Sequence, residues 1–139
     1  MTNPEVTIDQ LNAMGKGTMI ENIGIEFIHL DGDSVIARMP VDHRTHQPYG
    51  LLHGGASVAL AETLGSVAAH SSVDATKYIC VGQEINANHI KSARSGYVYG
   101  KATPIHIGKG SHVWEIRITN EANELICISR ITMAILEKK

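Results

Sequence analysis

The spacing of apolar residues changes several times along the chain, and each change predicts a different element. At the start, Leu11, Met14 and Met19 are spaced like one face of a helix, which predicts a short helix over residues 8–19. Two glycines fall within that stretch, and glycine lowers helix stability by about 1 kcal/mol relative to alanine. We therefore expect this helix to be weak and interrupted.

A period of two begins at residue 23 and predicts a β-hairpin. Apolar and other residues alternate over residues 23–28, an Asp-Gly-Asp turn signal occupies residues 31–33, and residues 34–39 form a second strand-like run. Pro40 ends this run, because proline cannot donate a hydrogen bond within a sheet. Residues 41–53, rich in histidine and other polar residues, are predicted to form a loop.

One long helix is predicted over residues 54–73. Many of its side chains are small, namely Ala56, Ser57, Ala59, Ala61, Gly65, Ser66, Ala68 and Ala69. Small side chains allow other backbone to approach closely, and a glycine inside a helix is costly unless packing requires it. We therefore expect the rest of the chain to enclose this helix.

Four further strands follow, predicted from alternation or from apolar runs bounded by turn residues. They cover residues 78–90, 96–103, 113–119 and 124–136. Consecutive strands joined by short turns pair antiparallel, so we predict a single α+β domain over residues 1–139, with an antiparallel sheet wrapped around one long central helix. The edge strands of so small a sheet need covering, and a second copy across a two-fold axis would do this.

Composition and charge narrow the choice of partners and compartment. The 139 residues are 43% apolar with a mean hydropathy of -0.04, which favours one packed core. Twelve basic and fourteen acidic residues give a net charge of -2 without a long basic run, so nucleic acid is a poor partner. Residues 1–10 lack the features of a secretory signal, and no apolar stretch approaches the ~20 residues that span a bilayer. We expect a cytoplasmic protein without membrane association.

The two cysteines, Cys80 and Cys127, lie in separate apolar runs. Free buried thiols in a reducing compartment are favoured over a disulfide. Neither thiol has a neighbour that would activate it, so neither is a candidate nucleophile.

The strongest functional signal covers residues 46–62, which read HQPYGLLHGGASVALAE. A glutamine stands fifteen residues before a glutamate, with His-Gly-Gly between them at the predicted helix start. This pattern resembles the signature of hotdog-fold thioesterases, especially the branch of the Glu-type 4-hydroxybenzoyl-CoA thioesterase and the bacterial menaquinone- and siderophore-pathway thioesterases. The likeness extends from Gly24 to about Leu136 and includes residues 85–89. It implies a hotdog fold and hydrolysis of an acyl-coenzyme A thioester to the free acid and coenzyme A.

Glu62 is the central candidate, because a carboxylate on an apolar helix is costly unless it is paired, protonated or functional. A structural role would be a hydrogen bond to neighbouring backbone or to a partner across an interface. The resemblance implies a catalytic role instead, either as general base for water or as a nucleophile that forms a mixed anhydride. The sequence leaves these two mechanisms open.

The glycine-rich helix start is a candidate oxyanion site. Gly54 and Gly55 begin the helix, where backbone N–H groups lack helical partners and the helix dipole is positive. Gly55 is also a candidate substrate contact. Glu62 lies eight residues further, about 12 Å along the helix axis at 1.5 Å per residue, so one chain is not expected to bring both groups to one carbonyl. We expect two copies to share the site, in agreement with the homodimer, and the homotetramer made of two dimers, that the resemblance implies.

Four other residues are candidates for the site. Ser66 lies four residues after Glu62 on the same helix face, where its hydroxyl either orients the carboxylate or is only a small packing group. Gln47 can donate its amide to the thioester oxygen, and His53 can donate to the carbonyl or simply support the loop. His89 ends a predicted strand beside the pocket and is a candidate contact for the acyl group.

Arg94 and Lys109 are the candidate contacts for the phosphorylated nucleotide of coenzyme A, with solvated surface charge as the alternative. His43 and His46 have the spacing of a ligand pair, but no cysteine or carboxylate cluster completes a metal site, so solvated loop histidines are favoured. We expect no metal and no cofactor, since coenzyme A is part of the substrate.

Rival functions differ in the residues that they require. A hydratase or dehydratase of the same fold needs a histidine paired with an acid at a different spacing. A non-catalytic acyl-CoA-binding or sensor module would not require Gln47 and Glu62. Acyl groups on a carrier protein remain an alternative substrate, and the branch resemblance favours aromatic or short bulky acyl groups over long chains.

Overall fold

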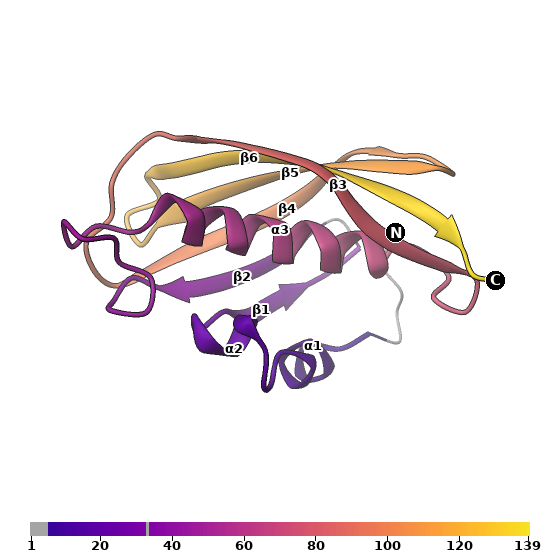
Figure 1. The fold of residues 1–139 in the computed structure, drawn as a ribbon, viewed down its shortest axis with the longest axis horizontal. Helices are drawn as coiled ribbons and strands as arrows, with labels where there is room; N and C mark the ends of the chain where they lie inside the picture. Colours follow the sequence, from indigo (N-terminus) through magenta and orange to yellow (C-terminus); the bar gives the residue numbers. More distant parts are fainter. Residues whose placement is uncertain (1–5, 33) are drawn as a thin grey trace.

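A six-stranded antiparallel sheet curves around one long helix in the computed structural model, which describes residues 6–32 and 34–139 (Figure 1). In chain order the elements are α1 (Ile8–Met14), α2 (Met19–Asn22), β1 (Glu26–Leu30), β2 (Val35–Pro40), α3 (Gly54–His70), β3 (Tyr78–His89), β4 (Tyr97–Ile107), β5 (Ser111–Asn120) and β6 (Leu125–Glu137). The predicted α+β architecture with one central helix is confirmed.

The order of strands across the sheet is β1-β2-β4-β5-β6-β3, so β3 pairs with β6 at one edge. The prediction that consecutive strands pair holds for β1 with β2 and for β4, β5 and β6, but it is wrong for β3 with β4. Residues 90–96 carry the chain across the end of the sheet instead of forming a tight turn. Hydrogen bonds from Ile90 N–H to Ile126 O and from Leu52 N–H to Ala93 O, both 2.8 Å, fix this crossing.

The helix α3 packs against the concave face of the sheet through small and medium-sized side chains (Figure 1). Its buried face consists of Ser57, Leu60, Ala61, Leu64, Gly65, Ala68 and Ala69. A β-carbon at Gly65 would lie 2.4 Å from Ile131 Cγ2, and one at Gly100 of β4 would lie 2.5 Å from Leu64 Cδ1. The helix and the sheet approach each other too closely for a side chain at either position, which confirms the predicted packing reason for Gly65.

Only one face of α3 is enclosed by the described residues. On its opposite face Gly55, Glu62 and His70 are exposed. Within one chain the expected enclosure of the helix therefore covers its inner face. The helix also ends at His70 rather than at residue 73, because residues 71–73 already form the turn that leads to β3.

The predicted helix over residues 8–19 is two short helices. Thr7 caps the start of α1, and Gly15 is the C-cap at its end. Gly17 has a φ of 75°, a left-handed conformation that breaks the helix before Thr18 caps α2. The expected interruption by the two glycines is thus confirmed.

The first hairpin forms as predicted, with shifted boundaries. β1 begins at Glu26 instead of residue 23, because Gly24, with a φ of 76°, turns the chain after α2. In the turn between β1 and β2, Asp31 accepts a hydrogen bond from Ser34 N–H (2.8 Å), and Asp33 lies outside the described residues. Among the later strands the largest difference is in β4, which continues to residue 107 instead of 103.

The edge strand β3 is largely uncovered in a single chain. Its Ile79 and Val81 side chains are 40% and 42% exposed. An uncovered edge that also carries exposed apolar side chains is a surface suited to pairing with another strand.

Both cysteines are buried and free, as predicted. Burial raises the pKa of the Cys80 and Cys127 thiols, which argues against a nucleophilic role. No helix in residues 6–32 or 34–139 is long and apolar enough to cross a membrane.

A buried histidine in β5 links the stability of the fold to pH. His112 is 1% exposed, and its Nδ1 accepts a hydrogen bond from Trp114 Nε1–H (3.3 Å). Burial, and secondly the neighbouring His106, lower the pKa of His112 below its ordinary value of 6.5. Because the unfolded chain then binds more protons, this contribution to stability is complete above pH 6.5 and is lost as the pH falls towards the folded pKa.

We predict that the free energy of unfolding falls less steeply in His112→Gln than in wild type between about pH 7.5 and pH 5. Urea unfolding at several pH values measures this slope. His43→Gln is the matched control, because the His43 side chain is 89% exposed, and it should keep the wild-type slope. Equal slopes in wild type and His112→Gln would contradict the prediction.

Candidate active site

The loop before α3 is held in place by hydrogen bonds to neighbouring segments. His53 N–H donates to Thr45 O (2.8 Å), and Thr45 Oγ1 donates to Pro40 O (2.6 Å). The His46 ring bonds through Nε2 to Arg94 O (2.9 Å). These bonds fix the loop relative to the start of α3.

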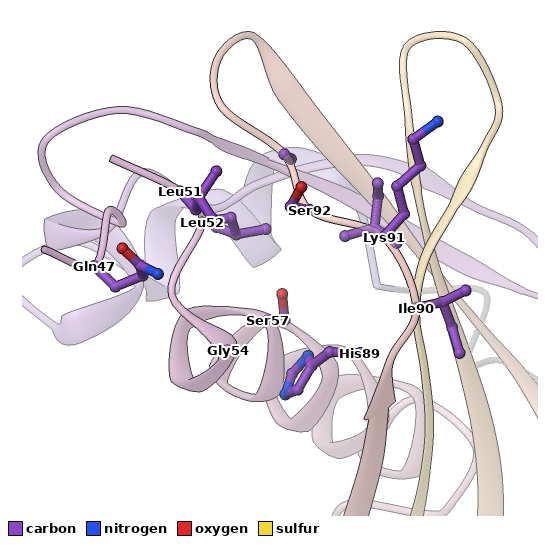
Figure 2. A pocket seen from close by; sticks show the side chains of 11 residues that line it. Gln47, Leu51, Leu52, Gly54, Ser57, His89, Ile90, Lys91 and Ser92 are labelled. Atoms are coloured by element: carbon purple, nitrogen blue, oxygen red, sulfur yellow. The ribbon is translucent and has the colours of Figure 1, made fainter. Parts of the chain in front are cut away.

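Gln47 presents an amide donor to a cavity at the start of α3. Its Oε1 accepts a hydrogen bond from Tyr49 N–H, so the side-chain nitrogen is the group left to bind a ligand. Figure 2 shows this nitrogen on the side of the amide that faces Ser57. An amide held in this way is suited to donate to a carbonyl oxygen.

This hollow, which we call the Gly54 cavity, has a volume of about 300 Å³ and a mixed polar and apolar lining (Figure 2). It is lined by Gln47, Leu51, Leu52, Gly54, Ser57, His89, Ile90, Lys91, Ser92, Ala93 and Ile126. The structure therefore brings together three of the predicted candidates, Gln47, Gly54 and His89.

Two residues of the first helical turn shape the wall of the Gly54 cavity. A β-carbon at Gly54 would lie 2.8 Å from His89 Nε2, so glycine is needed where the imidazole lies against the helix. Ser57 is 1% exposed, and its hydroxyl points into the cavity (Figure 2). Sequence interpretation treated Ser57 only as a small packing residue, although its position three residues after Gly54 places it on the same helix face.

His53 is the N-cap of α3. Its Nδ1 accepts a hydrogen bond from Gly55 N–H (2.7 Å), so the proton of the neutral ring lies on Nε2, which can donate to a ligand. The Gly55 N–H is therefore occupied by the His53 side chain. Gly54 remains the candidate oxyanion donor.

Glu62 lies in a second hollow, an apolar groove of about 780 Å³ along the outer face of α3, which we call the Glu62 groove. It is lined by Val6, Leu11, Met14, Met19, Ile20, Gly55, Val58, Ala59, Glu62, Thr63, Ser66, Val67, His70, Ser71 and Ala75. Ser66 and Gly55 thus share a hollow with Glu62, and Ser66 lies on the predicted helix face. One wall of the groove is α3, and the other is the α1–α2 segment.

The Glu62 carboxylate is exposed in a single chain and lies beside the edge strand β3. A β-carbon at Gly82 would be 3.1 Å from Glu62 Oε2, which places the carboxylate against the backbone of β3. The pairing of β3 with β6 is irregular between Gly82 and Glu84. A carboxylate enclosed between two copies stays a prediction, because one chain supplies only one side of that enclosure.

The candidate residues thus form two groups, one at each of the two hollows beside α3. Gln47, Gly54 and His89 meet at the start of α3, whereas Glu62 and Ser66 line a different hollow. The rise of the helix separates Gly54 from Glu62 by about 12 Å along the axis. Within one chain the two groups line different hollows, as expected from their spacing.

Arg94 and Lys109, the predicted coenzyme A contacts, line neither the Gly54 cavity nor the Glu62 groove. Lys109 lies in the turn between β4 and β5, beside a separate cavity of about 560 Å³. A different cation, Lys91, lines the Gly54 cavity and forms an ion pair with Glu124. The sequence could have pointed to Lys91, because this residue lies two positions after His89, the last residue of β3.

The fold and the two hollows define a class of protein: a sheet wrapped around one helix, with a glycine-rich helix start and a carboxylate further along it. Residues 49–127 match the family model of the thioesterase superfamily. The chain belongs to this superfamily, and thioester hydrolysis is its class of activity. The predicted hotdog fold is confirmed.

Individual relatives agree over nearly the whole chain. The 1,4-dihydroxy-2-naphthoyl-CoA hydrolase of Escherichia coli (strain K12) is 51% identical over 132 residues, which are 95% of this chain and 96% of that protein. The structure of a Gln-to-Ala mutant of a Pseudomonas aeruginosa thioesterase has a TM-score of 0.96 at 47% identity and covers 99% of both chains.

Two structures of one Staphylococcus aureus protein are also similar. Its Glu-to-Ala mutant has a TM-score of 0.83 at 43% identity and covers 86% of this chain and 99% of that one. Its Gln-to-Ala mutant, which is described as a thioesterase enzyme, has a TM-score of 0.82 at 44% identity and covers 84% and 97%.

We predict that Gly82→Ala lowers kcat for thioester hydrolysis about three- to tenfold, because the new methyl group would lie 3.1 Å from Glu62 Oε2 and push the carboxylate aside by a few tenths of an ångström. A thiol-release assay measures the rate, and light scattering checks that the oligomeric state is unchanged. Gly110→Ala is the matched control, since a β-carbon there meets nothing within 4 Å. A kcat equal to that of the control would contradict the prediction.

Proposed function

We propose that this chain hydrolyses acyl-CoA thioesters to the free acid and coenzyme A at sites that two copies share. One observation carries the proposal: the donors at the start of α3 and the carboxylate of Glu62 face different hollows on the same helix. Two copies with antiparallel α3 helices would place the Gly54 cavity of one against the Glu62 groove of the other. Each dimer would then hold two equivalent sites.

The roles of the residues follow from what a thioester requires. Gly54 N–H, the Gln47 amide and His53 Nε2–H are assigned to the thioester oxygen, where negative charge develops. Glu62 from the other copy either takes a proton from the attacking water or attacks the carbonyl carbon to form a mixed anhydride that water then hydrolyses. Ser66 orients the carboxylate or the water. Both routes consume one water, break the carbon–sulfur bond and release the acid and the coenzyme A thiol.

Two relatives support these assignments. The E. coli relative is named for hydrolysis of 1,4-dihydroxy-2-naphthoyl-CoA, whose acyl group is aromatic, and this favours an aromatic acyl group here. The mutated Glu and Gln of the S. aureus protein lie fifteen residues apart, the same separation as Glu62 and Gln47.

The uncovered edge of β3 is the surface assigned to the dimer contact. Pairing of two β3 strands would continue the sheet and cover Ile79 and Val81, which are exposed in a single chain. Two such dimers would form the homotetramer expected from the resemblance. This scheme uses no metal or organic cofactor, and the free buried cysteines fit a reducing, cytoplasmic compartment.

We predict that Glu62→Gln lowers turnover of benzoyl-CoA by at least about a hundredfold, because the amide can neither accept a proton nor attack the carbonyl. A free-thiol reagent measures the rate, and circular dichroism confirms folding. Glu121→Gln is the matched control, since Glu121 is exposed in the turn between β5 and β6, outside β3, and lines neither hollow. Turnover near the wild-type rate in Glu62→Gln would refute the proposed mechanism.

We predict that the inactive variants Gln47→Ala and Glu62→Gln complement each other when the two chains are refolded together. A mixed dimer holds one intact site and one doubly altered site, and half of randomly formed dimers are mixed, so the mixture should regain about a quarter of wild-type activity. Each variant refolded alone is the control. Failure to regain activity in a mixture shown to contain mixed dimers would exclude a site shared in this way.

A further inference from the structure

We propose that the α1–α2 segment forms the wall of the Glu62 groove that receives the acyl group, and that Met14 and Met19 on this wall favour bulky aromatic acyl groups. This inference rests on the proposed function, because it assigns the acyl end of the same substrate. It is carried by the polarity of the groove, by the way α1 is fixed, and by the exposure of the two methionines.

Most of the residues that line the Glu62 groove are apolar. Thr63 Oγ1 donates to Ala59 O (2.7 Å), and His70 Nδ1 bonds to Ser66 O (2.9 Å), so the Thr63 hydroxyl and one of the two His70 ring nitrogens are occupied by the backbone of α3. The pantetheine arm of coenzyme A carries two amides, and burying them without partners would be costly. An apolar acyl group suits this groove better.

The Gly54 cavity suits the coenzyme A end instead. It presents the Gln47 amide and the Ser57 hydroxyl, whereas the Lys91 amine points away from these two groups (Figure 2) and pairs with Glu124. The amide and the hydroxyl can pair with amides and with phosphate oxygens. The thioester carbonyl, which must reach both Gly54 N–H and Glu62, would lie where the two hollows meet.

The wall itself is held at a fixed distance from α3. The Asn12 side chain donates to Phe27 O (3.0 Å) and accepts from Phe27 N–H (2.8 Å), which fastens α1 to β1 at two points. Leu11 of α1 is 5% exposed and belongs to the core. These contacts therefore fix the width of the gap between α1 and α3.

Two methionines on this wall are left uncovered. Met14 is 72% exposed and Met19 is 60% exposed, and among the large apolar side chains of the described residues only Tyr49 is more exposed than Met14. Both line the groove. Methionine is flexible and polarizable, so its sulfur adapts to an aromatic ring and makes favourable contacts with it.

In the proposed dimer the partner's Gly54 cavity would meet the groove at Glu62, but the β3 contact is not expected to cover these methionines. The proposed dimer contact is at β3, whereas α1 packs on β1 at the opposite edge of the sheet (Figure 1). The groove volume of about 780 Å³ lies in the range of roughly 300–1,000 Å³ that is typical of small-molecule pockets. The acyl group of the substrate fits a groove that has this volume and that the β3 contact leaves open beside the methionines.

The test compares Met14→Ala/Met19→Ala with wild type on benzoyl-CoA and acetyl-CoA in a thiol-release assay. We expect kcat/KM for benzoyl-CoA to fall about tenfold or more, mainly through KM, and the value for acetyl-CoA to stay within about twofold. Ile105→Ala is the matched control, because Ile105 is 52% exposed but does not line the groove. Asn12→Ala, which releases α1 from β1, should reduce the preference for benzoyl-CoA in the same direction and provides a second variant if the first fails to fold.

Three outcomes separate the possible failures. Equal losses on both substrates, or no loss on either, would overturn the assignment of the wall while leaving the proposed function intact. A change in oligomeric state of the methionine variant, measured by light scattering, would also overturn it, because the two methionines would then belong to a contact between copies. Absence of wild-type turnover on every acyl-CoA tested would instead refute the proposed function on which the inference rests.

Discussion

The close approach of α3 to the sheet is the constraint on which the rest of the structure depends. At Gly65 and Gly100 there is no room for even one methyl group between the helix and the sheet. Overpacking of a core typically costs about 1–3 kcal/mol, so these two positions restrict the sequence strongly. Because the inner face of α3 is used entirely for this contact, its outer face and its first turn remain available for chemistry.

A straight helix also fixes where its functional groups lie. Gly54 and Glu62 are separated by the helical rise alone, and no change of side-chain rotamer brings the start of the helix to the middle of its outer face. The hydrogen bond from Gly55 N–H to His53 occupies the Gly55 donor, so Gly54 is left as the candidate oxyanion donor. The same bond sets the tautomer of the His53 ring. The geometry therefore favours a site that needs a second copy of the chain.

The sequence predicted the parts of the fold that depend on local pattern. The long helix, the strands and the reason for Gly65 could be read from spacing and composition, because burial of one face imposes a period on the chain. The pairing of β3 with β6 could not, because it depends on hydrogen bonds of residues 90–96 to distant segments. Likewise, the motif made Gln47 and Glu62 candidates, but Ser57 is small enough to be taken for packing, and its place in the lining of the Gly54 cavity depends on where the loop before α3 lies.

The Gly54 cavity and the Glu62 groove differ in polarity, and this difference matches the two ends of the proposed substrate. The substrate of a CoA thioesterase is polar at one end and, for an aromatic acyl group, apolar at the other, and the Gly54 cavity and the Glu62 groove have matching character. In the proposed function the scissile bond would lie at their boundary, where the carboxylate of one copy would face the amide donors of another. In a single chain that carboxylate is exposed to water. Assembly would remove the water and strengthen every polar contact at the carbonyl, so formation of the dimer and of the reactive site would be one event.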